Sequence, residues 1–155
     1  MNRFKTFFVV LALVLLTGAA AHAGETEDLL AATDIFQGLS QAQLSQVASV
    51  SFTRFGASGE TLIPQGEVLD TLYTLSSGHA VVNVEGVGQV FEFGPGVVVG
   101  EGSFVSGGPA SADVVLDQDS DVIEIDGVAL RELMEADCCL GYAIMKNMAF
   151  KLTTY

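Results

Sequence analysis

The feature that most constrains the fold is a long series of short β-forming runs between Ser49 and Asp126, separated by glycine or aspartate turns. Short strands at this spacing are typical of a β-sandwich or a β-barrel. We expect strands over residues 49–55, 61–63, 71–76, 79–85, 89–93, 97–99, 112–116 and 121–126. Apolar and polar residues alternate in Leu72–Leu75 and Val82–Glu85, which indicates strands with one buried and one solvated face.

Helical signals flank this β region on both sides. Ser40 and Gln43 have the spacing of a capping box, which predicts a short helix beginning after Ser40. After Asp126, a good N-cap, the apolar residues recur at helical spacing, and Asp137 is placed to cap a final helix. The predicted fold class is therefore mainly β with flanking helices.

The final helix carries an apolar stripe at four-residue steps. Its members are Leu140, Ile144, Met148 and Leu152, and the stripe is widened by Tyr142, Met145 and Ala149. This is more apolar surface than one contact with the β region would cover. Two interpretations stay open: packing into the core alone, or packing shared with the seam of a homodimer.

Residues 1–23 have the pattern of a secretory signal peptide. Arg3 and Lys5 give the positive start, residues 7–16 the apolar middle, and Ala21–Ala23 the small-residue cleavage site. The apolar run is shorter than the roughly 20 residues that a membrane-spanning helix needs. We therefore expect an exported protein, periplasmic or secreted, with no stable membrane insertion after cleavage.

Cleavage after Ala23 would leave residues 24–155, a chain of 132 residues, which fits a single domain with a real core. We expect residues 24–33 to form a lead-in and residues 34–155 to form the domain.

The charge of the mature chain argues against nucleic-acid binding. Without Arg3 and Lys5 it has four basic residues against nineteen acidic ones, a net charge of −15. Nucleic-acid binding depends on Lys and Arg that neutralise backbone phosphates. We therefore expect no nucleic-acid partner, and the acidity is explained by solubility alone.

No residue pattern indicates catalysis, because no serine, cysteine or carboxylate pair has an evident base partner. Asp117, Asp119 and Asp121 have the opening spacing of a calcium loop, but Val122 and Val128 stand where its glycine and bidentate glutamate belong. We interpret the segment as a solvated hairpin turn. The sequence therefore predicts no enzyme, no metal site and no cofactor.

The two cysteines, Cys138 and Cys139, are adjacent within the predicted final helix. A disulfide between neighbours would strain the helical backbone, so three other interpretations stay open. They are two buried small apolar residues, an intermolecular disulfide across a dimer in an oxidising compartment, or a redox or metal role. The metal role is the weakest, because His79 is the only histidine of the mature chain.

Residues 93–115, which read F-G-P-G-V-V-V-G-E-G-S-F-V-S-G-G-P-A-S-A-D-V-V, have the layout of a small anion cradle. Gly100 and Glu101 end an apolar run, a short segment follows, and the turn Gly107–Pro109 leads into an apolar strand that begins near Ala112. Such a layout predicts a ligand site.

From Ile35 to about Leu152 the sequence resembles the cyclic nucleotide-binding domain shared by catabolite-activator-type regulators, cyclic-nucleotide-dependent kinases and gated channels. The resemblance rests on I-F-Q-G-L-S (35–40), G-E-T-L-I-P-Q-G-E (59–67), L-Y-T-L-S-S-G-H-A-V-V (72–82), F-G-P-G (93–96) and V-G-E-G-S-F (99–104). It implies an eight-stranded antiparallel β-roll of the jelly-roll type, with a short N-terminal helix and two C-terminal helices.

The phosphate-binding cassette of that family has a Gly-Glu start, a one-turn helix, a Pro-Arg pair and two small residues. The corresponding positions in this sequence are Gly100, Glu101, Gly102, Ser103, Pro109, Ala110, Ser111 and Ala112. The resemblance implies that Glu101 accepts a hydrogen bond from the ribose 2′-hydroxyl. It also implies that the backbone N–H groups of Gly102 and Ser103 face the cyclic phosphate, and that Ser111 can add a hydroxyl donor.

Ala110 stands at the position of the cassette arginine. A guanidinium group neutralises a phosphate through two parallel hydrogen bonds, and one charge-assisted contact contributes about 1.5 to 3 kcal/mol. We therefore expect a degenerate nucleotide site in a non-enzymatic ligand-binding or regulatory interaction module. The alternative is a functional sensor of cyclic AMP, cyclic GMP or another small ligand.

Overall fold

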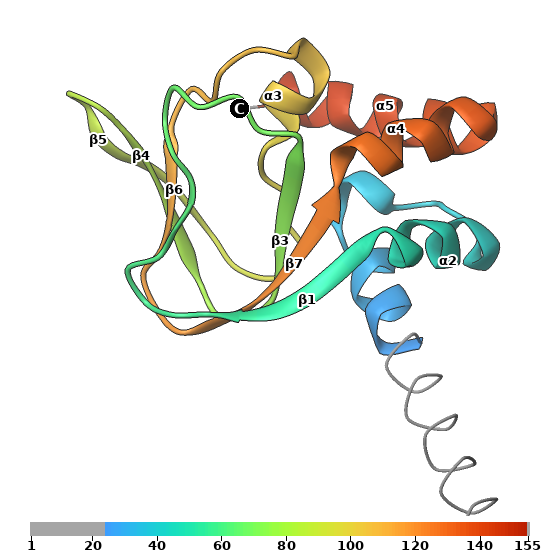
Figure 1. The fold of residues 1–155 in the computed structure, drawn as a ribbon, viewed down its shortest axis with the longest axis horizontal. Helices are drawn as coiled ribbons and strands as arrows, with labels where there is room; N and C mark the ends of the chain where they lie inside the picture. Colours follow the sequence, from blue (N-terminus) through green and yellow to red (C-terminus); the bar gives the residue numbers. More distant parts are fainter. Residues whose placement is uncertain (1–23, 155) are drawn as a thin grey trace, which may run out of the picture.

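The computed structural model describes residues 24–154, in which a β-roll packs against a group of helices (Figure 1). The signal peptide predicted at residues 1–23 lies outside this range. Among the described residues, no helix combines the length and the apolar character needed to cross a membrane.

The chain enters the roll through helical segments. Residues 24–31 are helical, and η1 (Asp34–Phe36) and α2 (Gln41–Ser49) follow. The predicted capping box at the start of α2 is confirmed: the Gln43 backbone N–H donates to the Ser40 hydroxyl, and the Ser40 backbone N–H donates to the Gln43 side chain.

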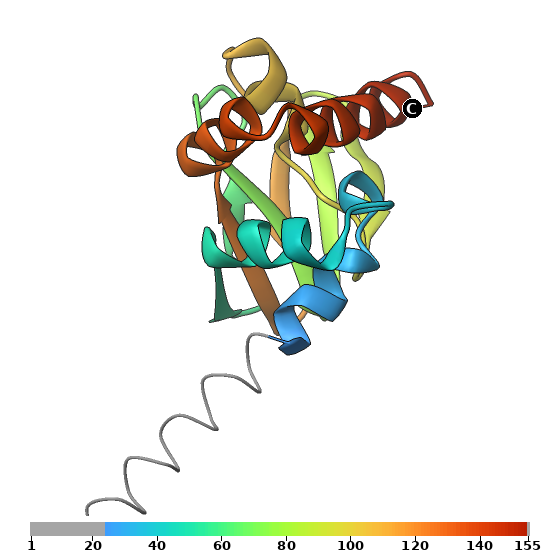
Figure 2. The same cartoon turned by 90° about the vertical axis from the view of Figure 1, so that its right-hand side faces the viewer.

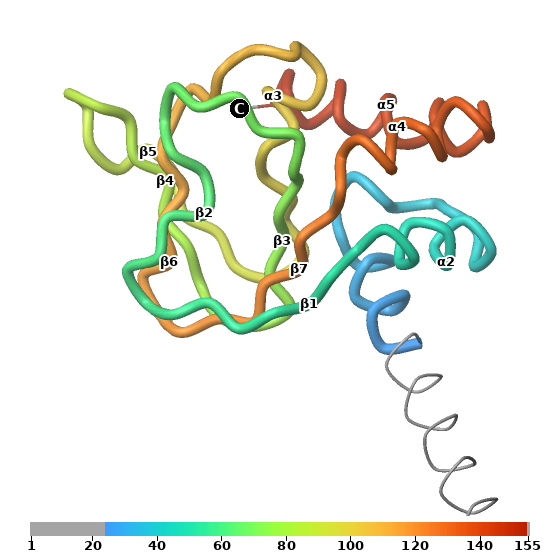
Figure 3. The backbone as a smooth tube through the Cα atoms, in the orientation of Figure 1, coloured from blue at the N-terminus to red at the C-terminus, as the bar shows by residue number. Residues whose placement is uncertain are grey.

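The part of the chain that the structure describes contains seven strands. They are β1 (Ser51–Gly56), β2 (Thr61–Ile63), β3 (Thr71–Ser77), β4 (Ala80–Val84), β5 (Gly88–Phe93), β6 (Asp113–Leu116) and β7 (Ser120–Asp126). They pair antiparallel in two sheets, of order β1-β7-β3 and β2-β6-β4-β5, and the chain passes repeatedly from one sheet to the other (Figure 3). The predicted mainly β roll with flanking helices is confirmed.

One of the eight strand predictions, residues 97–99, is wrong, because this segment is not a strand. It is reduced to one isolated bridge between Tyr73 and Val99. The backbone N–H of Val98 donates to the Asp34 carboxylate at 3.2 Å, so this segment bonds to η1. A glycine with positive φ stands on each side of the segment and turns the chain out of extended geometry.

Two helices close the fold: α4 (Gly127–Ala136) and α5 (Cys138–Leu152). Both predicted N-caps are confirmed. The Asp126 carboxylate accepts from the backbone N–H groups of Val128 and Ala129, and the Asp137 carboxylate accepts from those of Cys139 and Leu140. Figure 2 shows α4 and α5 lying together above α2 on one side of the roll.

The sheet β1-β7-β3 separates two apolar cores. Successive residues of a strand point to opposite faces, so Ile123 and Ile125 in β7 pack with the helices, whereas Val122 packs inside the roll. Both cores bury large aliphatic side chains, and each such side chain contributes about 1.5 to 3 kcal/mol to the free energy of folding when fully buried.

Three of the four residues predicted for a dimer helix belong to the first of these cores. Leu140, Ile144 and Met148 are each 0% exposed, whereas Leu152 is 45% exposed. A fully buried side chain cannot contact a second molecule, which corrects the assignment of these three residues to a dimer seam. Dimerisation itself stays a prediction, and on α5 it would use the opposite face, where Tyr142 is exposed.

Cys138 and Cys139 are exposed free thiols in the first turn of α5. The interpretation of the pair as buried small residues is therefore wrong, since the core-facing side of this turn is taken by Leu140. An intermolecular disulfide and a redox role stay open. Among residues 24–154, no group of three or more side chains suited to hold a metal ion is present.

We expect Thr74→Val to raise the free energy of unfolding by about 1 kcal/mol, because a buried hydroxyl without a partner carries an uncompensated desolvation cost. Thr74 in β3 is 1% exposed, and its hydroxyl has no hydrogen-bond partner among the described residues. Urea denaturation measures the change. Thr33→Val is the matched control: Thr33 is equally buried but donates to Leu29 O at 2.9 Å, so its loss should destabilise the fold. Equal effects of the two substitutions would contradict this account.

We also expect the cap of α5 to make stability depend on pH. Hydrogen bonds from the Leu140 backbone N–H, the Gln43 side chain and the Cys139 backbone N–H hold the pKa of Asp137 below its ordinary value of 3.8. A lowered folded pKa contributes stability that is complete above about pH 5 and is lost as the pH falls through the folded value.

The variant Asp137→Asn should therefore be less stable than the wild type at pH 7 and equal to it near the acid limit. Thermal unfolding from neutral to acid pH checks this expectation. Glu135→Gln, which removes one carboxylate from the exposed side of α4, is the control for net charge. A difference between Asp137→Asn and the wild type that stays constant with pH would refute a role of the carboxylate charge.

Candidate functional site

The candidate site is built around α3 (Glu101–Ser106), which begins directly after Gly100. Gly100 has φ of 95°, and a Cβ atom at this position would lie 2.9 Å from the backbone oxygen of Thr71. Only glycine fits both the positive φ and this close approach. Gly100 therefore fixes Glu101 as the first residue of α3.

A cavity of about 690 Å³ lies between α3, the roll and the end of α5. All eight cassette residues predicted from the sequence line it: Gly100, Glu101, Gly102, Ser103, Pro109, Ala110, Ser111 and Ala112. The structure thus brings together two groups that are separated along the chain by the turn at Gly107. That these residues bind a ligand stays a prediction.

The walls of the cavity are mostly aliphatic. Its apolar lining comes from Ile63, Val82, Val90, Phe91, Val97, Val99, Val114 and Leu152. These residues come mainly from β2, β4, β5, β6 and the segment before α3, so the cavity opens onto the inside of the roll.

Ala110, which the resemblance places at the arginine position, has a short apolar side chain that packs against the core of the roll. Its backbone is held on both sides: the Gly66 N–H donates to Ala110 O at 2.9 Å, and the Ala110 N–H donates to Glu67 O at 2.8 Å. These two hydrogen bonds fix the backbone of Ala110 beside the turn at Gly66.

Lys151, near the end of α5, places an ammonium group at the cavity. Its Nζ lies 2.8 Å from Asp34 Oδ2 and 3.4 Å from Glu101 Oε1, and it donates to the backbone oxygen of Val98. The side chain of Lys151 is 9% exposed and that of Glu101 is 14% exposed. Glu101 and Lys151 thus line the cavity, whereas Asp34, the second carboxylate paired with Lys151, does not.

Sequence reasoning missed Lys151, although a signal was present. Lys151 follows Met148 by three residues and continues the buried stripe of α5 that contains Ile144. A lysine at a core position is almost never fully buried unless it is paired. Its place on the stripe therefore indicates an acidic partner inside the fold, but not which one.

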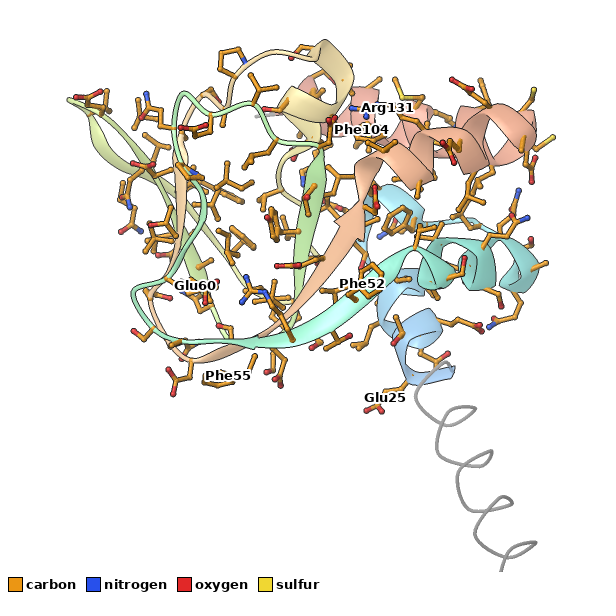
Figure 4. All side chains as sticks on the ribbon, viewed as in Figure 1. Glu25, Phe52, Phe55, Glu60, Phe104 and Arg131 are labelled. Atoms are coloured by element: carbon orange, nitrogen blue, oxygen red, sulfur yellow. The ribbon has the colours of Figure 1, made fainter. Side chains whose placement is uncertain are left out.

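Arg131 does not line the cavity. Its guanidinium carbon lies 4.5 Å from the centre of the Phe104 ring, and its Nη2 atom lies 2.9 Å from Asp70 Oδ1. Figure 4 shows Arg131 and Phe104 together beside α3. Arg131 therefore packs against the outer side of α3, where Phe104 and Asp70 already contact its guanidinium.

Arg54 lies at the other end of the roll, where Figure 4 labels its partner Glu60. Its guanidinium nitrogens lie 2.6 Å from carboxylate oxygens of Glu60 and Glu124. These hydrogen bonds raise the pKa of Arg54 above its usual range, and the bond from Arg54 lowers the pKa of Glu60. Lys151 is thus the single cation among the described residues that line the cavity.

The aspartates with calcium-loop spacing have separate partners. His79 Nδ1 lies 2.8 Å from Asp117, the Ser58 N–H donates to Asp119, and the Ser77 hydroxyl donates to Asp121. These contacts tie the turn between β6 and β7 to neighbouring turns of the roll, in line with its interpretation as a hairpin turn.

The fold is that of a known class of domain. The family model of the cyclic nucleotide-binding domain matches residues 53–137, which is more than half of the chain. The chain therefore belongs to the cyclic nucleotide-binding domain family.

Solved structures with this fold include a protein from Geobacter metallireducens GS-15 described as cyclic nucleotide-binding. It is 23% identical, with a TM-score of 0.72, over 83% of this chain and 96% of that one. The regulatory domain of Toxoplasma gondii PKA, crystallised with cAMP, is 21% identical with a TM-score of 0.77, over 90% of this chain and 52% of that one.

The regulatory subunit of a cAMP-independent protein kinase A from Trypanosoma brucei is 22% identical with a TM-score of 0.66. The similarity covers 70% of this chain and 40% of that one. This chain thus spans about half or less of the two kinase regulatory chains. At these identities the similarities show the fold alone.

Proposed function

We propose that the chain is an exported, non-enzymatic ligand-binding module with a regulatory role, in which the cassette has lost its selectivity for cyclic nucleotides. One observation carries the proposal: the single cation that lines the cavity, Lys151, is already engaged by carboxylates, and Ala110 lines the cavity where the resemblance implies an arginine. The fold is preserved and the charge that a phosphate needs is missing.

Charge balance supports this loss of selectivity. A cyclic phosphate entering a partly dry cavity needs a cation that is free to approach it. Lys151 would have to leave Asp34 at 2.8 Å, and Glu101 would then face the phosphate with its own negative charge. Whether Lys151 stays with the carboxylates or moves to the phosphate, one anionic group is left without a cation. The affinity for a cyclic nucleotide is therefore lowered.

Isothermal titration calorimetry with cyclic AMP and cyclic GMP tests the proposal. We expect no binding in the micromolar range for either nucleotide. A dissociation constant of about 1 μM or tighter, which corresponds to about −8 kcal/mol, would contradict the degenerate site.

The second candidate function is a working cyclic nucleotide sensor, and the position of Lys151 favours it. An ammonium group that lines the cavity could replace the missing guanidinium as a point charge. This candidate requires that cyclic AMP binds and that Lys151→Met removes the binding. Unchanged affinity in that variant would exclude Lys151 as the phosphate partner.

Export and dimerisation belong to the same proposal. The pattern of residues 1–23 supports export, and protein recovered from the periplasm of an expressing bacterium should begin at Gly24. The exposed side chains of Tyr142, Met145 and Leu152 on α5 support a homodimer, which light scattering on the mature protein would detect.

A further inference from the structure

We propose that the cavity binds a small, largely apolar molecule that carries a hydrogen-bond donor and no negative charge, with the donor directed at Glu101. This inference rests on the proposed function, because it assumes that the cavity is not selective for cyclic nucleotides. It goes beyond that function by naming the class of ligand.

The size and walls of the cavity define the apolar part of the ligand. Its volume of about 690 Å³ lies within the roughly 300 to 1,000 Å³ typical of small-molecule pockets. Val82, Phe91 and Val114 come from three different strands and present apolar surface to it. Ala110 adds a methyl group where the family pattern has a charged fork. A mainly hydrocarbon or aromatic body therefore fits these walls.

The carboxylates define the charge of the ligand. Lys151 contacts both Asp34 and Glu101, so one positive group serves two negative ones. Glu101 is also the first residue of α3, and its own negative charge therefore occupies the end of the helix that would otherwise favour an anion. An anionic ligand in this cavity would be repelled by the carboxylate of Glu101, whereas a neutral or cationic ligand would not.

The carboxylate of Glu101 can also accept further hydrogen bonds. Within the described part of the chain, its carboxylate has one ion-pair contact, the long one of 3.4 Å to Lys151. An ionised carboxylate can only accept hydrogen bonds, and it offers about four lone-pair sites. An amine N–H or a hydroxyl on the ligand would satisfy these sites inside the cavity.

A matched pair of fluorescent probes tests this ligand class on the mature protein. N-phenyl-1-naphthylamine is a neutral aromatic amine with one N–H donor, and 8-anilinonaphthalene-1-sulfonate has the same skeleton with an added sulfonate. We expect the neutral probe to bind at least about tenfold more tightly, the factor that corresponds to 1.4 kcal/mol. The variant Glu101→Gln should reduce this preference to about threefold or less, because it removes the like charge.

Two variants test whether the neutral probe binds inside the cavity. Ala110→Phe fills the cavity from the cassette side, and Val90→Phe narrows it from an edge position that is 51% exposed and tolerates a larger side chain. Each should weaken binding by about tenfold or more. Phe55→Ser removes an exposed aromatic ring outside the cavity and should leave binding unchanged. Circular dichroism confirms that each variant is folded.

Equal affinity for the two probes overturns the inference, as does neutral-probe binding that neither cavity variant weakens, or no neutral-probe binding at all. These results leave the proposed loss of nucleotide selectivity intact, because calorimetry with cyclic AMP and cyclic GMP measures that loss separately. Tight cyclic nucleotide binding instead overturns the proposed function, whatever the probes show.

Discussion

Replacing Lys151 by methionine is expected to lower the free energy of unfolding by about 3 kcal/mol, the lower end of the range for breaking a buried ion pair. Methionine keeps most of the apolar stem of Lys151 on the buried side of α5, so the lost packing is small. The main effect is electrostatic, because Glu101, which is 14% exposed, loses its cation. Urea denaturation at pH 7 gives the measurement.

Two further variants isolate the charge effect. Lys146→Met removes the same group from the exposed side of the same helix and should change stability by no more than about 0.5 kcal/mol. The double variant Lys151→Met with Glu101→Gln should recover at least about 1 kcal/mol of the loss, since it removes an unpaired carboxylate. An effect of Lys146→Met as large as that of Lys151→Met would contradict a specific role for Lys151.

The ion pairs of Lys151 connect the cassette with the N-terminal and C-terminal segments of the domain. Asp34 lies in η1, Glu101 begins α3, and Lys151 stands near the end of α5. The Asp34 carboxylate also accepts from the backbone N–H groups of Ile35 and Val98. A ligand that draws Glu101 toward itself would therefore weaken the contact of Glu101 with Lys151 on α5.

Local chemistry made most of the fold predictable. The caps at Ser40, Asp126 and Asp137 each depend on a side chain that bonds the backbone within three residues, so sequence spacing alone identifies them. The strand β2 (Thr61–Ile63) matches its predicted bounds in full, because glycine-containing turns limit it on both sides. Interactions of this range do not depend on how the rest of the chain packs.

Errors arose where distant contacts decide the outcome. Residues 97–99 have strand-like composition, but the Asp34 carboxylate, more than sixty positions earlier, takes the hydrogen bond of Val98. The stripe of α5 was ambiguous for a similar reason. Periodicity shows that Leu140 and Ile144 share a face, but not whether that face meets the same chain or another one.

The candidate site likewise has one part that the sequence predicted and one part that it did not. The eight cassette positions are adjacent in two short runs, so the resemblance located them, and the cavity gathers all of them. The cation beside them comes from a residue some fifty positions further on, which no cassette pattern includes. Charge compensation between distant segments is a property of the packed structure, which the spacing of the cassette residues does not reveal.

Restoring the family residue with Ala110→Arg is expected to increase affinity for cyclic AMP by about tenfold to a hundredfold, because a charge-assisted contact contributes about 1.5 to 3 kcal/mol. Ala110 lines the cavity, and its backbone is fixed by hydrogen bonds to Gly66 and Glu67. The new guanidinium would therefore start from a defined position. Calorimetry on the variant and on the wild type gives the comparison.

Val105→Arg is the control for this experiment, because it adds the same charge to the exposed side of α3, outside the residues that line the cavity. It should leave nucleotide affinity unchanged, whereas a general electrostatic effect would increase affinity in both variants. No gain in Ala110→Arg would mean that Glu101 captures the new guanidinium as an internal ion pair or that the cavity no longer has the shape of a nucleotide site. A gain confined to Ala110→Arg would show that the cavity kept its nucleotide geometry and that one missing charge changed its ligand.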